Sequence, residues 1–156
     1  MMRVFIILKP DSKYGKRYGA DVLRLHNHLF AEEKVRISQL TGRDTFNPIE
    51  RLEEIWPQDY LCACAVDDND TLLGFMTFSL GSCAKDNFVY IGNYYVLEEA
   101  RSQGVGRALM DKVRDYGKSK GCGWMSLDVL DNNIKAISVY EKMGFRTECR
   151  EMIKEI

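Results

Sequence analysis

Hydrophobic and polar residues follow two different periodicities along this chain of 156 residues. Residues 3–8 form an apolar, β-branched run, which predicts a first strand that stops at a proline and a polar connection. From Asp21 onward the apolar positions recur at helical spacing, and Asn47 followed by Pro48 is typical of a helix start. We therefore expect one strand and then two helices, the second of which ends before Pro57.

Three β-prone runs occupy the middle of the chain. LCACAV, LLGFMTFSL and FVYIGNYYVL are separated by DDND and SCAKDN, whose residues suit hairpin turns. Short turns of this kind join antiparallel neighbours, so the pattern predicts an antiparallel meander.

The last third of the chain alternates between helix and strand signals. Residues 104–120 have helical spacing and are followed by a glycine, and residues 124–130 predict a strand. A further helix begins at Asn133 and ends before Gly144, and residues 145–153 predict a weaker final strand. The expected order is β-α-α-β-β-β-α-β-α-β. Because no repeat, low-complexity segment or linker interrupts it, we expect a single α/β domain over residues 1–156.

Composition and charge narrow the class of partner. Hydrophobic residues make up 46% of the chain and charged residues 29%, as in soluble globular proteins, and the net charge is only −1. No overall field is available to hold nucleic acid or an anionic membrane, so neither is expected as a partner. The N-terminal MRVFIIL run is too short to span a membrane and is not followed by a small-residue cleavage site, which predicts a cytoplasmic location.

Cysteine and histidine spacing does not indicate a metal site or a disulfide framework. The five cysteines are odd in number and form no C-x-x-C pair. Cys62 and Cys64 alternate within an apolar run, so we expect both on one face of a strand as small buried hydrophobes. His26 and His28 are two residues apart on a helix and point in different directions, which argues against a shared metal ion. We expect surface positions for both, with the acceptor pocket as the alternative.

The clearest chemical signal is YYVLEEARSQGVGRALM, in which a strand runs through a glycine-containing loop into a helix. A helix start leaves about four backbone N–H groups without internal partners and carries roughly half a positive charge, so it suits an anion. Gly104 and Gly106 lack a Cβ and would let phosphate oxygens approach the backbone.

A P-loop is excluded because G-K-[ST] is absent. A dinucleotide fingerprint would need glycine where Leu109 stands, although Asp128 lies where a ribose-binding acid is expected.

Two motifs resemble the GNAT N-acetyltransferase superfamily. Residues 101–106 match its R/Q-x-x-G-x-G/A motif, behind a strand that ends in Tyr95-Val96, and residues 127–145 match its L-x-V…N-x-x-A-x-x-x-Y-x-x-x-G-F pattern. The resemblance implies a mixed, mostly antiparallel sheet with helices on both faces and a V-shaped splay between the fourth and fifth strands. It also implies acetyl-CoA as the cofactor. The cofactor contacts that it implies are Tyr95, Val96, Arg101, Gln103, Gly104, Val105, Gly106, Arg107, Ala108 and Asn133.

Acetyl transfer to an amine needs a proton acceptor and a proton donor. An alkyl amine has a pKa of about 10.4 and arrives protonated, and a thiolate with a reference pKa of about 8.5 leaves more readily beside a hydroxyl donor. The resemblance assigns the donor role to Tyr140, although Ile137 and Met143 at i−3 and i+3 are also typical of the core face of a helix.

Asp128 is the candidate base. It resembles the glutamate on this strand of bacterial ribosomal-protein alanine acetyltransferases and is one methylene shorter. An exposed strand residue is the alternative interpretation, with Glu98, Glu99 or an ordered water as the acceptor. Main-chain groups near Val96 are expected to bind the thioester carbonyl, with Asn93 and Tyr94 toward the acceptor.

The predicted function is transfer of the acetyl group of acetyl-CoA to a small-molecule primary amine by direct attack in a ternary complex. A protein N-terminal or lysine acetyltransferase and a non-catalytic acyl-CoA-binding module are the alternatives. Acidic residues such as Glu32 and Glu33 could attract a cationic amine, and a solvated helix face explains them equally well. An isologous homodimer is the commonest assembly for such domains.

Overall fold

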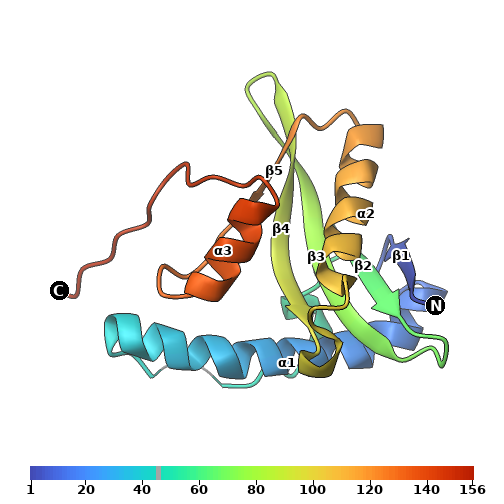
Figure 1. Cartoon of the computed structure of the whole chain (residues 1–156), viewed down its shortest axis with the longest axis horizontal. Coiled ribbons are helices and arrows are strands. Elements are labelled where there is room, and N and C mark those ends of the chain that lie inside the picture. Colours follow the sequence, from blue (N-terminus) through green and yellow to red (C-terminus); the bar gives the residue numbers. More distant parts are fainter. Residues whose placement is uncertain (45–46) are drawn as a thin grey trace.

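A computed structural model describes residues 1–44 and 47–156. In this part of the chain, five strands form one sheet (Figure 1). The strands lie in chain order across the sheet: β1 (Arg3–Ile7), β2 (Leu61–Val66), β3 (Leu72–Cys83), β4 (Asp86–Val96) and β5 (Trp124–Leu127). Each neighbouring pair is antiparallel except β4 and β5, which run parallel. The predicted mixed, mostly antiparallel sheet is therefore confirmed.

Helices cover both faces of this sheet. The helical elements are α1 (Lys13–Thr41), η1 (Leu52–Glu54), η2 (Glu98–Ala100), α2 (Val105–Ser119) and α3 (Ile134–Lys142). Helix α1 packs on β3 and β4, whereas α2 packs on β1 to β4. Tyr95 of β4 reaches Glu32 of α1, while its neighbour Val96 packs beside Leu109 of α2. Since successive strand residues point to opposite faces, α1 and α2 lie on opposite sides of the sheet.

Helix α1 begins eight residues before the predicted start at Asp21. Ser12 caps it by accepting a hydrogen bond from the Gly15 amide at 3.1 Å. Gly15 and Gly19 made this stretch look like a loop, yet both lie inside the helix. A Cβ on Gly15 would come within 2.2 Å of the Pro10 carbonyl oxygen, and one on Gly19 within 2.7 Å of the Leu52 side chain. These glycines permit close packing and do not mark a turn.

The second predicted helix, from Pro48 to Trp56, is wrong. Only the short 3-10 turn η1 forms there. The Asn27 side chain of α1 accepts from the Ile49 amide at 2.9 Å and donates to the Ile49 carbonyl at 3.0 Å. This pair of bonds satisfies the backbone that a helix would otherwise have used, so the segment is fastened to α1 instead.

The predicted final strand over residues 145–153 is also wrong, because this segment has no regular structure and runs away from the sheet (Figure 1). Arg146, Glu148 and Arg150 would all lie on one face of such a strand. These charged side chains cannot pack against the sheet, and a strand is stabilised largely by such packing. The segment therefore has little to hold it in a strand.

The strands β4 and β5 separate at one end. Their pairing covers only Phe88–Ile91 of β4 against Trp124–Leu127, although β4 continues to Val96. Within β4 the register with β3 shifts, since Ile91 and Asn93 have partners on β3 and Gly92 has none. The predicted V-shaped opening between the fourth and fifth strands is therefore confirmed.

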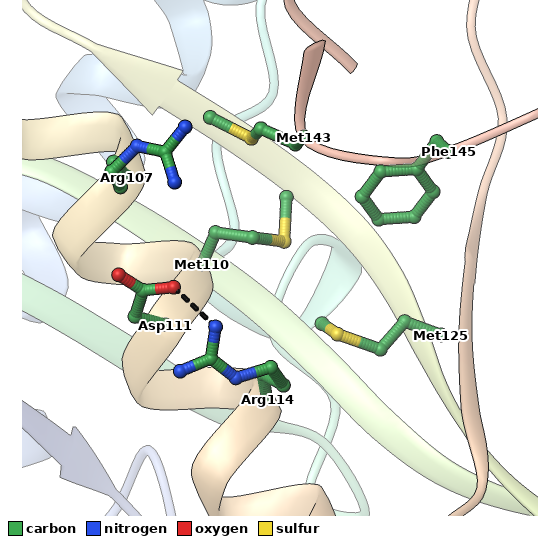
Figure 2. Close-up of a pocket in the computed structure, with 7 residues that line it drawn as sticks. All are labelled: Arg107, Met110, Asp111, Arg114, Met125, Met143 and Phe145. Atoms are coloured by element: carbon green, nitrogen blue, oxygen red, sulfur yellow. Dashed lines mark hydrogen bonds and ion pairs between the residues drawn. The ribbon is translucent and has the colours of Figure 1, made fainter. Parts of the chain in front are cut away.

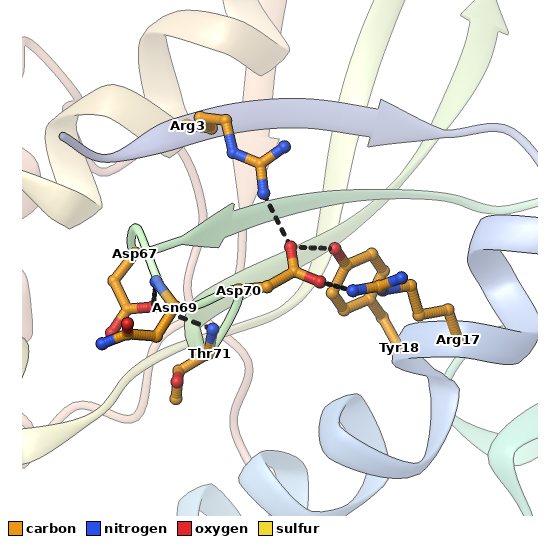
Figure 3. A network of polar contacts seen from close by, with 7 residues as sticks. All are labelled: Arg3, Arg17, Tyr18, Asp67, Asn69, Asp70 and Thr71. Atoms are coloured by element: carbon orange, nitrogen blue, oxygen red, sulfur yellow. Dashed lines mark hydrogen bonds and ion pairs between the residues drawn. The ribbon is translucent and has the colours of Figure 1, made fainter.

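A polar contact fastens the N-terminal half of the molecule (Figure 3). Asp70, in the turn between β2 and β3, accepts hydrogen bonds from Arg3 of β1 and Tyr18 of α1, each at 2.7 Å, and forms an ion pair with Arg17. Its backbone is left-handed, with φ of 65°. One carboxylate thus joins the first strand, a hairpin turn and the first helix.

The described residues also bear on the metal and membrane predictions. Cys62 and Cys64 are fully buried with their sulfurs 3.8 Å apart, on one side of β2 as predicted. Outside residues 45–46, no group of three His, Cys, Asp or Glu side chains is placed to hold a metal ion. Within that same part of the chain, no helix has the length and apolarity needed to cross a bilayer.

Candidate active site

The loop between β4 and α2 presents backbone amides at one end of the opening. Ser102 and Gly104 are left-handed, with φ of 61° and 83°. The helix makes its first internal hydrogen bond from the Ala108 amide to the Gly104 carbonyl, at 3.0 Å. The amides of Val105, Gly106 and Arg107 consequently have no carbonyl partner within the helix, and they carry the positive end of its dipole. This geometry suits an anion such as a diphosphate.

Arg101 and Gln103 hold this loop through contacts with the protein itself. The Arg101 guanidinium donates to the Val96 carbonyl at 3.0 Å and to Glu32 of α1 at 3.1 Å, and it lies 5.2 Å from the centre of the Tyr95 ring. The Gln103 amide donates to the Glu99 carbonyl at 2.8 Å. Both residues were predicted to contact the cofactor, and here their side chains brace the loop.

Tyr94 lies on the α2 side of β4, where its hydroxyl reaches the first turn of the helix. A Cβ on Gly106 would be only 2.0 Å from this hydroxyl oxygen. The neighbouring residue Asn93 points the other way, toward His26 of α1. Both side chains were expected to lie toward the acceptor, and the structure places them on opposite faces of the sheet.

Tyr140 lies beside the same opening. Its ring centre is 6.2 Å from that of Tyr94 and 5.9 Å from that of Phe145. Asn133 caps the helix that carries it, by accepting from the Ala136 amide at 3.2 Å. Burial raises the pKa of Tyr140, and the nearby Tyr94 and Glu33 raise it further. Tyr140 is therefore a neutral phenol at physiological pH and can donate its proton in a hydrogen bond.

Asp128 follows β5 and has a specific partner. It is exposed, and its carboxylate accepts a hydrogen bond from the Tyr90 hydroxyl of β4 at 2.7 Å. This bond, together with burial, raises the pKa of Tyr90 to about 12. Tyr90 belongs to the part of β4 that is paired with β5, so Asp128 lies near the point where the two strands separate.

Glu33 of α1 is a half-buried carboxylate whose charge reaches Tyr140. Burial raises the pKa of Glu33, while Arg36 lowers it. Its neighbour Glu32 is already bound by Arg101, whereas Glu33 has no ion pair among the residues that the structure describes. From the sequence, attraction of a cationic amine and a solvated helix face explain these two glutamates equally well, and only their contacts in the structure distinguish them.

His26 is buried, with 2% of its surface exposed, so the expectation of a surface position is wrong for this residue. Its Nε2 lies 3.2 Å from Asn93 Oδ1, and the Asn93 amide nitrogen donates to the Ile55 carbonyl at 3.3 Å. Asn93 Oδ1 is thus the acceptor, so Nε2 carries the proton. Burial lowers the pKa of His26, although the Asn93 bond opposes that shift.

A pocket opens beside the first turns of α2 (Figure 2). Its inner lining is made of thioether and aromatic side chains, and two arginines lie on the α2 side, one of them bonded to an aspartate at 2.6 Å. The lining residues are Arg107, Met110, Asp111, Arg114, Met125, Met143 and Phe145. The pocket combines an apolar interior with positive charge next to the proposed anion site.

Several known acetyltransferases are similar to this chain in sequence. A thialysine N-epsilon-acetyltransferase of Sus scrofa is 40% identical over 58 residues, which are 37% of this chain and 34% of that protein. An aminoglycoside N(6')-acetyltransferase type 1 of Salmonella typhimurium is 28% identical over 98 residues, covering 60% of this chain and 68% of that protein. The chain spans about a third of the length of the thialysine acetyltransferases that it matches.

A solved structure and a family model extend the likeness to most of the chain. The structure of AAC(6')-Iy in complex with the bisubstrate analogue CoA-S-monomethyl-acetylneamine matches with a TM-score of 0.70 at 21% identity, covering 100% of this chain and 98% of that one. At that identity the likeness concerns the fold. Residues 24–145, which include both motifs and α1 from Arg24 onward, match the model of the acetyltransferase (GNAT) family. The chain belongs to the acetyltransferase (GNAT) family.

Proposed function

We propose that this chain is an N-acetyltransferase that transfers the acetyl group of acetyl-CoA to the primary amine of a small molecule. One arrangement supports the proposal above the others: the opening between β4 and β5 has the amides of the α2 start on one side and the Tyr140 phenol beside it. The thialysine and aminoglycoside acetyltransferases that match in sequence are named for small amines, whereas one structural neighbour is named a ribosomal-protein-alanine N-acetyltransferase.

The residues at the start of α2 fit the diphosphate of acetyl-CoA. A Cβ on Gly104 would meet nothing within 4 Å, so its surroundings are open to a ligand. The amides from Gly104 to Arg107 would hold the diphosphate, and the adjoining pocket lined by Met110, Met125 and Met143 suits an adenine ring, with Arg107 toward the phosphates. Main-chain groups of Tyr95 and Val96 and the side chain of Asn133 are proposed contacts for the pantetheine arm.

Acetyl-CoA, when bound, supplies an activated acetyl group as a thioester. The amine nitrogen bonds to the carbonyl carbon while the carbon–sulfur bond breaks. Tyr140 donates a hydrogen bond to the departing sulfur. Because its pKa lies above that of a thiol, about 8.5, it stabilises the negative charge without giving up its proton completely. Asp128 is the proposed acceptor of the amine proton, from a position at the base of the opening.

The acceptor amine is proposed to enter from the α1 side. The charge of Glu33 on that helix acts on Tyr140, and an incoming ammonium group would offset the cost of keeping this carboxylate half-buried. This gives Glu33, which the sequence left undecided, the proposed role of binding the acceptor's positive charge.

The cytoplasm is our proposed location, since the odd number of cysteines gives no sign of the disulfide framework typical of small exported proteins. A homodimer is proposed on general grounds, as the commonest symmetric assembly.

Thiol release from acetyl-CoA, measured across a panel of diamines, aminoglycosides and peptide N-termini, tests this function. Wild-type protein should turn over at least one small amine, and Tyr140→Phe should lower kcat by roughly 10- to 1,000-fold while acetyl-CoA still binds. Turnover on peptides alone would contradict the small-molecule acceptor. Acetyl-CoA binding without turnover on any amine would contradict the enzymatic function.

A matched pair of glycine variants tests the anion site. Gly104 and Gly121 stand at opposite ends of α2, both have positive φ, and a Cβ on either meets nothing within 4 Å. Gly104→Ala and Gly121→Ala therefore impose similar backbone strain. Only Gly104→Ala should weaken acetyl-CoA binding, as measured by calorimetry. An equal loss in both variants would mean that strain, and not the site, was responsible.

A further inference from the structure

The hydroxyl of Tyr94 occupies the position that a side chain at Gly106 would need. The distance from an ideal Gly106 Cβ is 2.0 Å to the Tyr94 hydroxyl oxygen and 3.3 Å to the ring carbon that bears it. The hydroxyl alone creates the conflict, because 3.3 Å is a contact that small shifts can relieve. The absence of a Cβ at Gly106 is thus explained by a residue of β4, 12 positions earlier in the chain.

This hydroxyl is free to bind a ligand. Among the described residues, the Tyr94 hydroxyl has no hydrogen-bond partner, and it is not one of the fully buried polar atoms that lack one. Burial raises the pKa of Tyr94, and Arg101 lowers it, so the group remains a protonated donor at neutral pH. A donor with some access to solvent therefore lies against the first turn of α2.

Tyr94 also connects the two halves of the candidate active site. Its hydroxyl adjoins Gly106 in the anion-binding turn, and its ring is 6.2 Å from that of Tyr140. The sequence motif accepts either glycine or alanine where Gly106 stands. In this chain alanine would displace the Tyr94 hydroxyl, so the choice between the two is set by Tyr94.

We propose that Tyr94 binds the cofactor, with its hydroxyl donating a hydrogen bond to the diphosphate at the α2 start, and that position 106 is glycine in order to admit this hydroxyl. The inference rests on the proposed function and adds a side-chain donor to a site otherwise made of backbone amides.

Calorimetric titration with acetyl-CoA tests the hydrogen bond. Tyr94→Phe removes only the hydroxyl and should weaken binding roughly 10-fold or more, as expected for a bond to a charged group. Tyr116→Phe is the matched control, since it deletes the same group from a tyrosine near the far end of α2, and its affinity should equal that of wild type. Unchanged affinity in Tyr94→Phe would overturn the proposal.

Acetyl-3′-dephospho-CoA identifies the phosphate that is contacted. The Tyr94→Phe variant should lose the same factor in affinity for this ligand as for acetyl-CoA, because both retain the diphosphate. If the loss disappears without the 3′-phosphate, the hydroxyl does not bind the diphosphate and the inference is wrong. Absence of binding to wild-type protein would instead refute the proposed function itself, and this inference with it.

A double-mutant cycle tests the role of Gly106. Gly106→Ala should weaken acetyl-CoA binding strongly in the wild-type background and much less in the Tyr94→Phe background, where the ring carbon is 3.3 Å away. Equal losses in both backgrounds would show that glycine is required for another reason. The cycle remains informative if Gly106→Ala lowers stability, since the melting temperatures of the four proteins should then show the same coupling.

Discussion

Arg101 donates to Glu32 at 3.1 Å, joining the loop before α2 to helix α1 on the opposite face of the sheet. The same guanidinium holds the Val96 carbonyl at the end of β4. The sequence predicted that Arg101 binds the cofactor directly, but in the structure its guanidinium is bound to Glu32. Arg101 therefore either positions the loop through Glu32, or it leaves Glu32 and binds the diphosphate when the cofactor arrives.

Glu32→Gln separates these two roles. If Arg101 positions the loop, removal of its partner's charge should weaken acetyl-CoA binding about two- to fivefold, a modest effect because both side chains are partly exposed. If Glu32 competes with the diphosphate for Arg101, binding should become tighter. We expect weakening, measured by calorimetry, with Glu141→Gln on the exposed face of α3 as the control.

Glu33→Gln tests the acceptor side of the site. Loss of this carboxylate should raise KM for the best cationic amine roughly 10-fold or more, because an ammonium group loses a partly buried charged partner. Acetyl-CoA affinity should not change. Glu33→Lys should raise KM further than Glu33→Gln, and Glu33→Asp less, since an electrostatic contact orders the variants by charge. If the KM values show no such order, Glu33 does not bind the acceptor.

The elements that the sequence predicted well are those whose signals are local. Helix α2 lies between Gly104 and Gly121, and both glycines are left-handed as helix ends often require. Asn133 caps α3 as its sequence context indicates. The loop between β4 and α2, the helices α2 and α3, and the splay of β4 from β5 could therefore be predicted from the amino-acid sequence and its family motifs.

The features that were missed depend on contacts between distant segments. Gly15 and Gly19 resemble turn glycines, yet they admit Pro10 and Leu52 to the surface of α1. Pro48 resembles a helix start, but the Asn27 side chain binds the backbone beside it. The proximity of Tyr94 to Gly106 likewise follows from how α2 packs on β4, and no spacing along the chain encodes it.

Asp70 is predicted to be important for stability, because its carboxylate contacts Arg3, Arg17 and Tyr18 (Figure 3). Asp70→Asn keeps a residue type that tolerates positive φ, but it removes the charge and replaces one acceptor oxygen by an NH2 donor. It should lower the free energy of unfolding by about 1–3 kcal/mol. Asp70→Ala should cost more, since alanine adopts this backbone conformation less readily.

Urea unfolding measures both Asp70 variants. Asp68→Asn, in the same turn, is the control, because its ion pair with the N-terminus is exposed on both sides and should contribute little. Acetyl-CoA binding should be unchanged below the unfolding transition. If Asp70→Asn and Asp68→Asn have the same free energy of unfolding, the charge of Asp70 does not contribute to the stability of the protein.

His26 is predicted to make stability depend on pH. Burial lowers its pKa in the folded protein below the reference value of 6.5, so the unfolded chain takes up a proton first as the pH falls. Because stability rises with pH wherever the unfolded state binds more protons, the folded state should lose stability as the pH falls through 6.5, by up to about 1.4 kcal/mol per pH unit. The loss ends once the pH passes below the folded pKa. Well above pH 6.5 the contribution of this histidine should be constant.

His26→Gln isolates this effect, since glutamine can still donate to Asn93 without titrating near neutral pH. Urea unfolding between about pH 8 and 5 should show that the free energy of unfolding falls less steeply with decreasing pH for His26→Gln than for wild type. This comparison of slopes does not depend on the stability of the variant at about pH 8. His28→Gln, two residues along the same helix, is the matched control. If wild type and His26→Gln decline in parallel, then His26 titrates equally in both states, and the burial seen here does not lower its pKa.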